Sequence, residues 1–423
     1  LERLDQDSSR QVEIETKFLE VQEGVLDEIS FDWRMNWGGS RPIFDPETGM
    51  PTIGPDGFPK LKFNKNMRGN TRTLASAHSP SGGAIDRDIQ ITSHVEKLKE
   101  YLTDYNPLNI RNFILGAYRD FANKRPSMDF WCAVSGIEIA MWDILGKYYN
   151  QPVYNLLGGK LREKIKVYAN GWAKELTNES LAKEALEMTE NRGFTALKFD
   201  PFSGPWEEWP ENEIIQEAAR RVGTVREAVG PEIDILVEVH RRLSISKAQN
   251  FAKKIEQYNP FWLEEPCISE NIDAIKEVKK STIIPIVSGE ALYSRNMFRE
   301  LVQKGAADII NPDICNTGGI LELSLISSMA ETFSIGVSPH GWNSTGIGGA
   351  AAIHTSATMS NFIIYEYMVH VEKFSKLITK NHPIVENSYI ELNNLPGLGT
   401  EIIEKNLTFN NKSSNKRSFG NLN

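Results

Sequence analysis

Seven polar residues recur along the last two thirds of the chain at a nearly fixed interval. They are separated by 40, 26, 26, 23, 27 and 26 residues: Lys198, Glu238, Glu264, Glu290, Asp313, His340 and Glu366. Each lies at or near the end of a short apolar run, such as ALKFD or FWLEEP, and stretches of helical composition separate the runs. One strand, one helix and two loops take ~25 residues in a (β/α)8 barrel, where catalytic groups sit at the C-terminal ends of several strands. The interval therefore predicts an α/β chain with a (β/α)8-type barrel whose polar strand ends meet at one mouth.

Composition restricts the class of protein and of partner. The 423 residues are 40% hydrophobic and 24% charged, which is ordinary for a soluble globular protein. No apolar stretch approaches the ~20 residues that span a bilayer, so we expect no membrane association. The three cysteines are isolated and form no CxxC pair, which favours a reducing cytoplasm over a disulfide scaffold. The formal charge of −9, with dispersed lysines and arginines, argues against nucleic acid as a partner.

The expected barrel accounts for only part of the chain. We expect an atypical segment at 1–85, helices of a second domain at 86–165, the barrel at 166–392, a return to the second domain at 393–407 and a frayed tail at 408–423. Residues 36–70 are rich in turn-forming residues, which predicts loops or a hairpin. Apolar residues at helical spacing predict helices at Val95–Tyr105, Ile110–Asn123 and Met128–Tyr149, and KVYANGW at Lys166–Trp172 reads as the first barrel strand.

Several motifs occur in one order between residues 92 and 402: SGIEIAMWDILGK at 135–147, VYNLLGG at 153–159, ALKFDPF at 196–202, WLEEP at 262–266, SGEAL at 288–292, NPDICNTGGI at 311–320 and SPHGW at 338–342. With them the chain resembles the mandelate racemase/muconate lactonizing branch of the enolase superfamily. Its ALKFDPF and a strand ending in Glu-x-His resemble most the acid-sugar dehydratases of the gluconate/galactonate type. The resemblance implies a barrel with an α+β capping domain, Mg2+ at the mouth, a sugar-acid substrate and a homo-oligomer.

The first 85 residues depart from that family, whose members begin with a short antiparallel sheet that completes the capping domain. Here VEIETKFLEVQEGVLDEISFDW (Val12–Trp33) instead resembles a strand segment of bacterial secretin channels. A gene fusion, a join in sequence assembly and coincidence are the explanations left open. If the usual sheet is absent, closure of the site over its substrate is in question.

Glu238, Glu264 and Glu290 are the metal ligands that the resemblance implies. Carboxylate oxygens suit Mg2+, which keeps open positions for water or substrate. Three carboxylates at 26-residue intervals on apolar strands favour a metal site over three separate salt bridges. Because neighbouring side chains of a strand face opposite ways, we expect Glu264 to bind the ion and Glu265 to stand behind it.

The two histidines near strand ends match the acid and the base of the family. His340, with Asp313 behind its ring, matches the base that removes the proton α to a carboxylate, and a carboxylate partner raises the basicity of an imidazole. His240 lies two residues after Glu238, so both side chains face the mouth, and it matches the acid that protonates the departing hydroxyl. For His340 the alternative is a structural histidine near a turn. For His240 it is a histidine that pairs with a neighbouring carboxylate.

Lys198 and Glu366 match groups that handle the substrate's negative charge. Lys198 matches the cation that stabilises the carboxylate or enolate. Asp200 stands where racemases carry a second lysine, which counts against a two-base racemase, and a turn cap before Pro201 is its simplest alternative role. Glu366 matches a group that hydrogen-bonds the substrate carboxylate, which requires a proton and hence a raised pKa.

These roles predict Mg2+-dependent dehydration of an aldonate, such as gluconate or galactonate, to a 2-keto-3-deoxy acid. In that reaction His340 removes the α-proton, the metal and Lys198 stabilise the enediolate, and His240 protonates the β-hydroxyl as it leaves. The alternatives are a sugar-lactone cycloisomerase or an epimerase on the same scaffold, and a catalytically impaired fusion protein.

Overall fold

The computed structural model describes residues 40–42, 61–63, 94–95, 97–98, 102, 105–122, 126–202, 210–342, 344–403 and 406. The secretin-like stretch at 12–33 and the polar tail at 408–423 lie outside them. The chain forms two units, Leu1–His94 with Leu407–Asn423, and Val95–Asn406. In the first unit, β1 (Ser40–Pro42) pairs antiparallel with β2 (Leu61–Phe63). This pair falls in the region where loops or a hairpin were predicted.

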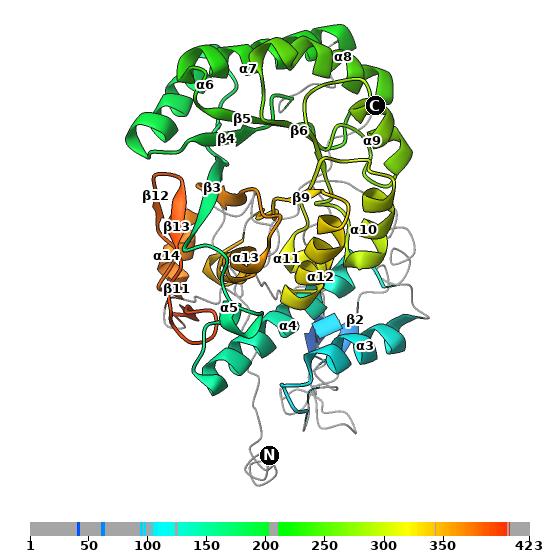
Figure 1. The fold of residues 1–423 in the computed structure, drawn as a ribbon, viewed down its shortest axis with the longest axis vertical. Coiled ribbons are helices and arrows are strands. Elements are labelled where there is room, and N and C mark those ends of the chain that lie inside the picture. The colour runs from blue at the N-terminus through cyan, green and yellow to red at the C-terminus, as the bar shows by residue number, and fades with distance from the viewer. Residues whose placement is uncertain are drawn as a thin grey trace, which may run out of the picture. The chain divides into compact units, whose positions relative to one another are not determined.

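Eight parallel strands build the centre of the second unit: β3 (Lys164–Asn170), β4 (Ala196–Phe199), β5 (Asp234–Glu238), β6 (Trp262–Glu264), β7 (Ile286–Ser288), β8 (Ile309–Ile310), β9 (Gly336–Val337) and β10 (Tyr365–Met368). Strands β3 to β9 pair in chain order, and β10 returns to pair with β3. A bridge between Val337 and Phe362 links β9 to the segment that leads into β10. The strands surround a common centre with helices outside them (Figure 1). This confirms the predicted (β/α)8-type barrel.

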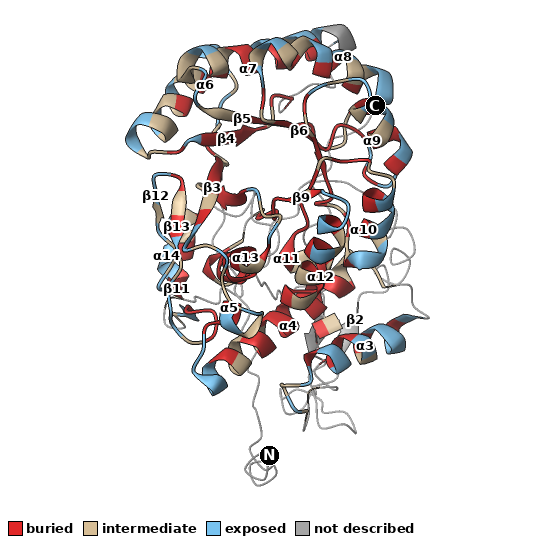
Figure 2. Cartoon of the chain, in the orientation of Figure 1, coloured by how far each residue is buried: buried red, intermediate tan, exposed pale blue. Residues whose placement is uncertain are grey.

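A helix lies between each pair of consecutive strands: α6 (Asn178–Leu186), α7 (Glu211–Val229), α8 (Ile245–Ile255), α9 (Ile272–Lys279), α10 (Ser294–Gln303), α12 (Ile320–Glu331) and α13 (Gly346–Thr358), with α14 (Glu372–Ile378) after β10. In α8 the buried residues are Ala248, Phe251, Ala252 and Ile255, the spacing of one helical face. Figure 2 shows buried residues on the strands and exposed residues on the outward faces of the helices.

The barrel interior is filled by one apolar layer below the polar strand ends. Its buried residues come from β3 to β8 and from the residue before β10: Tyr168, Ala196, Leu236, Trp262, Val287, Ile309 and Ile364. Such a layer makes the barrel a packed core with no pore through it. It also closes the floor of the mouth, because Trp262 lies two residues before Glu264 and donates from Nε1 to its Oε2 at 2.9 Å.

Helices α3 (Ile110–Phe121), α4 (Met128–Tyr149) and α5 (Val153–Leu156) precede the barrel strands. The short helix α11 (Ile314–Thr317) lies between β8 and α12. Glu138 on α4 accepts from the backbone N–H groups of Ile320 and Leu321, at 2.7 and 2.9 Å, and so caps the start of α12. Gly319 precedes that start with φ 91°, and a Cβ there would meet Glu138 Oε2 at 2.0 Å. The polar face of α4 therefore fixes the segment that follows β8.

The remaining elements are short. Glu187–Asn191 forms a π-helical turn after α6 and Glu256–Tyr258 a 3-10 turn after α8. Four strands follow α14: β11 (Thr379–Lys380), β12 (Val385–Glu386), β13 (Tyr389–Glu391) and β14 (Glu401–Ile402). β13 pairs antiparallel with the first residues of β3, which explains why β3 begins two residues before the predicted start. Gly171, with φ 73°, follows its end. In the described part of the chain no helix has the length and apolar character to span a bilayer.

Candidate active site at the barrel mouth

Three carboxylates meet at the C-terminal ends of β5, β6 and β7. One oxygen each of Glu238, Glu264 and Glu290 lies within 4.8 Å of the others. The parallel register sets Glu238 directly beside Glu264. All three are buried, with exposed fractions of 1%, 0% and 9%. The structure thus brings together the three residues predicted as metal ligands.

Lys198, at the end of β4, is a buried cation among these carboxylates. Its Nζ lies 2.6 Å from Glu264 Oε1, 2.8 Å from Glu366 Oε1 and 3.4 Å from Glu238 Oε2. Burial alone would lower the pKa of Lys198, but Glu264 and Glu366 raise it well above its usual range. These carboxylates therefore favour the charged ammonium, which suits a charge-stabilising role.

Glu265 belongs to a second network behind the three carboxylates. Its Oε1 accepts from the Ser288 hydroxyl at 2.9 Å and the Gly289 N–H at 2.7 Å, and its Oε2 accepts from the Ser269 hydroxyl. These bonds tie the end of β6 to the end of β7. The guanidinium of Arg241 bridges this network to the three carboxylates, because its Nη1 donates to Glu290 Oε1 and lies 3.5 Å from Glu265 Oε2.

His340 and Asp313 form a pair on adjacent strand ends. Nδ1 of His340 lies 2.7 Å from Asp313 Oδ2, and the other Asp313 oxygen accepts from the Cys315 N–H at the start of α11. Nε2 points toward the carboxylates, at 3.2 Å from Glu290 and 3.4 Å from Glu366. Burial alone would lower the pKa of His340, but Glu366, Glu290 and Asp313 raise it well above its usual range.

Glu366, at β10, corrects one expectation from the sequence. A raised pKa and a bound proton were expected, so that the side chain could donate to a substrate carboxylate. Instead it accepts from Lys198, from Asn170 Nδ2 at 2.8 Å and from the Gly341 N–H at 2.7 Å. Burial opposes its ionisation, but Lys198 and His340 lower its pKa to about 2. Glu366 is therefore an ionised acceptor in this structure.

His240 and Asp200 form a second histidine–aspartate pair, just after the ends of β5 and β4. Nδ1 of His240 lies 2.6 Å from Asp200 Oδ2, and Arg242 donates to the same oxygen at 2.6 Å. The other oxygen of Asp200 accepts from the Phe202 N–H, so the predicted turn cap is present as well. Burial would raise the pKa of Asp200, but the hydrogen bond from His240 lowers it to about 2. Burial would lower the pKa of His240, but Glu238 and Asp200 raise it.

The buried acids of the mouth outnumber its permanent cations. We call Glu238, Glu264, Glu265, Glu290 and Glu366 the acidic cup; all are buried. Two permanently charged side chains face it, Lys198 and Arg241. The pKa of Glu264 stays well above its usual range because of burial and the charge of Glu238, although Lys198 lowers it. An excess of buried carboxylate oxygens fits a hard divalent cation such as Mg2+.

The sequence missed three of the groups that shape the cup. Arg241 lacked a signal, since an arginine beside His240 is read from sequence alone as a solvent-exposed charge. Asn311 donates to Glu264 Oε1 at 2.9 Å, and Asn170 donates to Glu366. Both asparagines lie at strand ends, in NPD and YANG, so the rule that selected the seven polar residues applied to them as well.

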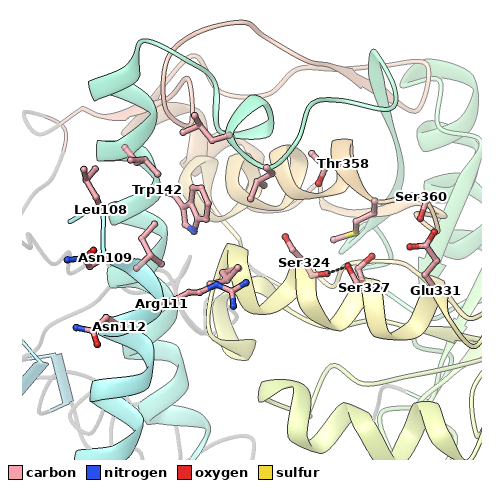
Figure 3. A pocket seen from close by; sticks show the side chains of 17 residues that line it. Leu108, Asn109, Arg111, Asn112, Trp142, Ser324, Ser327, Glu331, Thr358 and Ser360 are labelled. Carbon is pink, nitrogen blue, oxygen red and sulfur yellow. Dashed lines mark hydrogen bonds between the residues drawn. The ribbon is translucent and has the colours of Figure 1, made fainter. Parts of the chain in front are cut away.

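A separate cavity of about 680 Å3 lies between α3, α4, α12 and the end of α13, and none of the acidic cup lines it (Figure 3). Arg111 and Trp142 lie on one side and the serines of α12 on the other. Ser324 donates to the Ile320 carbonyl and Ser327 to Asn361 Oδ1, so these hydroxyls are engaged by the protein. Glu331 is the one carboxylate among its described lining residues. The cavity therefore lacks the paired titratable groups of the mouth.

Comparisons with known proteins agree with this geometry. The family description "Mandelate racemase / muconate lactonizing enzyme, N-terminal domain" matches residues 75–158, and "Enolase C-terminal domain-like" matches residues 180–406. The first match begins inside the segment expected to be atypical. Together the two matches cover the helices before the barrel and nearly all of the barrel.

Two curated relatives are dehydratases. The chain is 32% identical over 322 residues to D-gluconate dehydratase of Thermoproteus tenax, an alignment that covers 75% of this chain and 64% of that protein. It is 31% identical over 319 residues to D-gluconate/D-galactonate dehydratase of Picrophilus torridus, covering 75% and 81%. A solved member of the enolase superfamily from Salmonella Typhimurium has a TM-score of 0.71 at 30% identity, covering 75% of this chain and 87% of that one. The chain belongs to the mandelate racemase/muconate lactonizing enzyme family of the enolase superfamily.

Proposed function

We propose that this chain removes water from a sugar acid at the barrel mouth and releases a 2-keto-3-deoxy acid. Gluconate and galactonate are the first substrates we expect, because two relatives at 31% and 32% identity are dehydratases of these acids. The observation that carries the proposal is that two histidines, each held by an aspartate, adjoin one acidic cup. Nε2 of His340 lies 3.2 Å from Glu290, and the N–H of His240 donates to Glu238 Oε1 at 2.7 Å. Dehydration requires one group that takes a proton and one that gives a proton.

Mg2+ is the proposed cofactor, held by Glu238, Glu264 and Glu290. Bound there, it supplies Lewis-acid stabilisation of the negative charge that develops next to the substrate carboxylate. Lys198 adds a second, fixed positive charge, since three carboxylates hold its ammonium in place. Glu290 is one of the carboxylates that raise the pKa of His340 and is also a proposed metal ligand, so a cation bound there would oppose that rise.

His340 is the proposed base. Its Nδ1 is committed to Asp313, so Nε2, which faces the cup, is the atom that takes the proton from C2 of the sugar acid. The electron pair of that C–H bond forms the enediolate. Asp313 holds the ring orientation and stabilises the imidazolium that results.

His240 is the proposed acid. Its Nδ1 is committed to Asp200, and Glu238 and Asp200 raise the pKa of the ring and so favour its protonated form, from which Nε2 can give its proton to the C3 hydroxyl. The C3–O bond breaks, water leaves, and the enol gains a proton at C3 to become the 2-keto acid. Asp200 is too weak a base to act from the opposite face, because its pKa is about 2.

The test is a screen of the purified chain against C5 and C6 aldonates and aldarates, with Mg2+ and with chelator. We expect 2-keto acid from one or a few of them, only in the presence of Mg2+. Glu290→Gln is expected to abolish product, and Glu277→Gln, an exposed glutamate on α9 with a side chain 52% exposed, is the matched control. A chain that binds Mg2+ but converts no acid would contradict the proposal. Conversion of a sugar lactone without keto acid would point to a cycloisomerase.

We also infer a homo-oligomer in the cytoplasm. The family resemblance supports the first inference, and the isolated cysteines support the second. Light scattering of the purified chain tests the assembly, and a monomeric mass would contradict it.

A further inference from the structure

Arg241 reaches the acidic cup by an unusual backbone path. His240 and Arg241 follow β5 with φ angles of 50° and 66°, so two consecutive residues other than glycine lie in the left-handed region. The N–H of Arg241 donates to the Glu265 carbonyl at 2.7 Å, which holds this turn against the end of β6. Strained conformations persist where the surrounding structure enforces them, often at functional sites. The turn carries the guanidinium from β5 past β6 to Glu290.

The guanidinium competes for a carboxylate that is also a proposed metal ligand. Arg241 donates to Glu290 Oε1, while Glu290 Oε2 faces Nε2 of His340 at 3.2 Å. Both oxygens of Glu290 are therefore engaged by groups of the protein. Glu238 and Glu264 differ, because the cation that they face is Lys198.

Arg241 also has a second carboxylate within reach. Glu265 Oε2 lies 3.5 Å from its Nη1, and the Ser269 hydroxyl donates to that same oxygen. Glu265 is fully buried and is held by three other donors, so it stays in place whether or not the guanidinium moves. The Arg241 side chain is 28% exposed, compared with 2% for Lys198, so of these two cations it has room to shift.

We propose that Arg241 is a built-in counter-ion of the acidic cup, which neutralises Glu290 when no divalent cation is bound and withdraws to Glu265 when one is. The inference rests on the metal site of the proposed function and on no later step of that reaction. Two cations on one carboxylate repel each other strongly in a buried site. Loss of the guanidinium is therefore expected to strengthen binding of Mg2+. It is also expected to lower the stability of the folded chain when no Mg2+ is bound.

The first experiment compares Arg241→Gln with the unchanged chain, both freed of metal by chelator. Calorimetric titration with Mg2+ is expected to give a dissociation constant lower by about 10-fold in Arg241→Gln. The melting temperature of this variant is expected to fall in chelator and to rise more on addition of Mg2+. Arg220→Gln is the control, because Arg220 lies on α7, outside the acidic cup, and pairs with Glu217. Affinity that is unchanged or weaker in Arg241→Gln would overturn the proposal and leave Arg241 as a brace for Glu290.

A second experiment needs no variant. Phenylglyoxal modifies accessible arginines, and peptide mass spectrometry can follow each site in the unchanged chain with and without Mg2+. Modification of Arg241 is expected to speed up with Mg2+, because the guanidinium loses its close contact with Glu290 and keeps only the longer one with Glu265, while that of Arg220 stays constant. A rate that is constant or slower at Arg241 would overturn the proposal even if Arg241→Gln fails to fold.

The outcomes separate this inference from the proposed function. A chain that binds Mg2+ and forms no keto acid refutes the dehydratase and leaves the role of Arg241 standing. A dehydratase whose Mg2+ affinity is unaffected by Arg241→Gln refutes only the counter-ion. An unchanged chain that binds no Mg2+ refutes both.

Discussion

The barrel mouth and the helical junction shift the pKa of buried ionisable groups in opposite directions. The helical junction is the region where Glu138 on α4 and His354 on α13 are buried. At the mouth, charged groups face charged groups: Lys198 and His340 lie against carboxylates that raise their pKa well above the usual range despite burial. At the junction, ionisable groups face peptide groups. Burial raises the pKa of Glu138 to about 8 and lowers that of His354 to about 4.

The contacts of His354 show why the junction keeps its groups neutral. Its Nδ1 accepts from the Tyr154 N–H at 3.3 Å, and its Nε2–H donates to the Leu398 carbonyl at 3.2 Å. A neutral imidazole satisfies both bonds, whereas a protonated one would direct a proton at a donor. Burial by itself suppresses charge, and burial beside an opposite charge preserves it. Of these two regions, only the mouth is therefore suited to proton transfer and charge stabilisation.

The largest expected effect is on turnover, when the proposed base at the barrel mouth is removed. His340→Asn removes the proposed base, and we expect turnover to fall by about 10²- to 10⁴-fold, the usual contribution of such a group. Affinity for Mg2+, measured by calorimetry, is expected to stay close to that of the unchanged chain, because His340 is not a proposed ligand. His354→Gln is the matched control and is expected to retain turnover. Loss of Mg2+ binding in His340→Asn would contradict the role assigned to His340.

The next effect is on how the free energy of unfolding depends on pH, through His354 at the helical junction. The folded pKa of His354 is about 4, below the ordinary value of 6.5, so the unfolded chain binds more protons between these values. This group's contribution to stability is complete above pH 6.5 and is lost as the pH falls toward 4, a loss on the order of 3 kcal/mol. Urea unfolding at a series of pH values should show a shallower slope in this window for His354→Gln. Parallel curves for the two chains would show that His354 titrates normally.

A smaller effect separates the two histidines of the mouth. His240→Asn removes the proposed acid, and we expect turnover to fall by about 10²-fold. Exchange of the α-proton with solvent should continue, because His340 is intact. In a substrate with fluorine in place of the C3 hydroxyl, fluoride leaves without being protonated, so conversion of this substrate by His240→Asn should be nearly unaffected. If the fluoro substrate slows as much as the natural one, His240 acts in some other step.

The contrast between the regions also shows what the sequence could predict. The seven polar residues lie at or beside strand ends. The 26-residue interval predicted that Glu238, Glu264 and Glu290 lie together, because parallel strands end at one rim of the barrel. His354 has no motif context and lies inside α13, not at a strand end.

What the sequence missed depends on contacts between strands. The ionised state of Glu366 follows from Lys198, which approaches from β4, and no local pattern encodes that contact. The role of Arg241 depends on two left-handed residues that a sequence pattern would not place there. The start of β3 is set by β13, more than 200 residues later in the chain.

In the proposed reaction, a sugar acid bound at the barrel mouth loses a proton from C2 and a hydroxyl from C3. The most direct test is proton NMR of the reaction in D2O, with the chain, Mg2+ and gluconate or galactonate. We predict a 2-keto-3-deoxy acid that carries one deuterium at C3, introduced when the enol becomes the ketone. Recovery of the sugar acid with deuterium at C2 and its hydroxyl at C3 retained would contradict the claim and identify an epimerase.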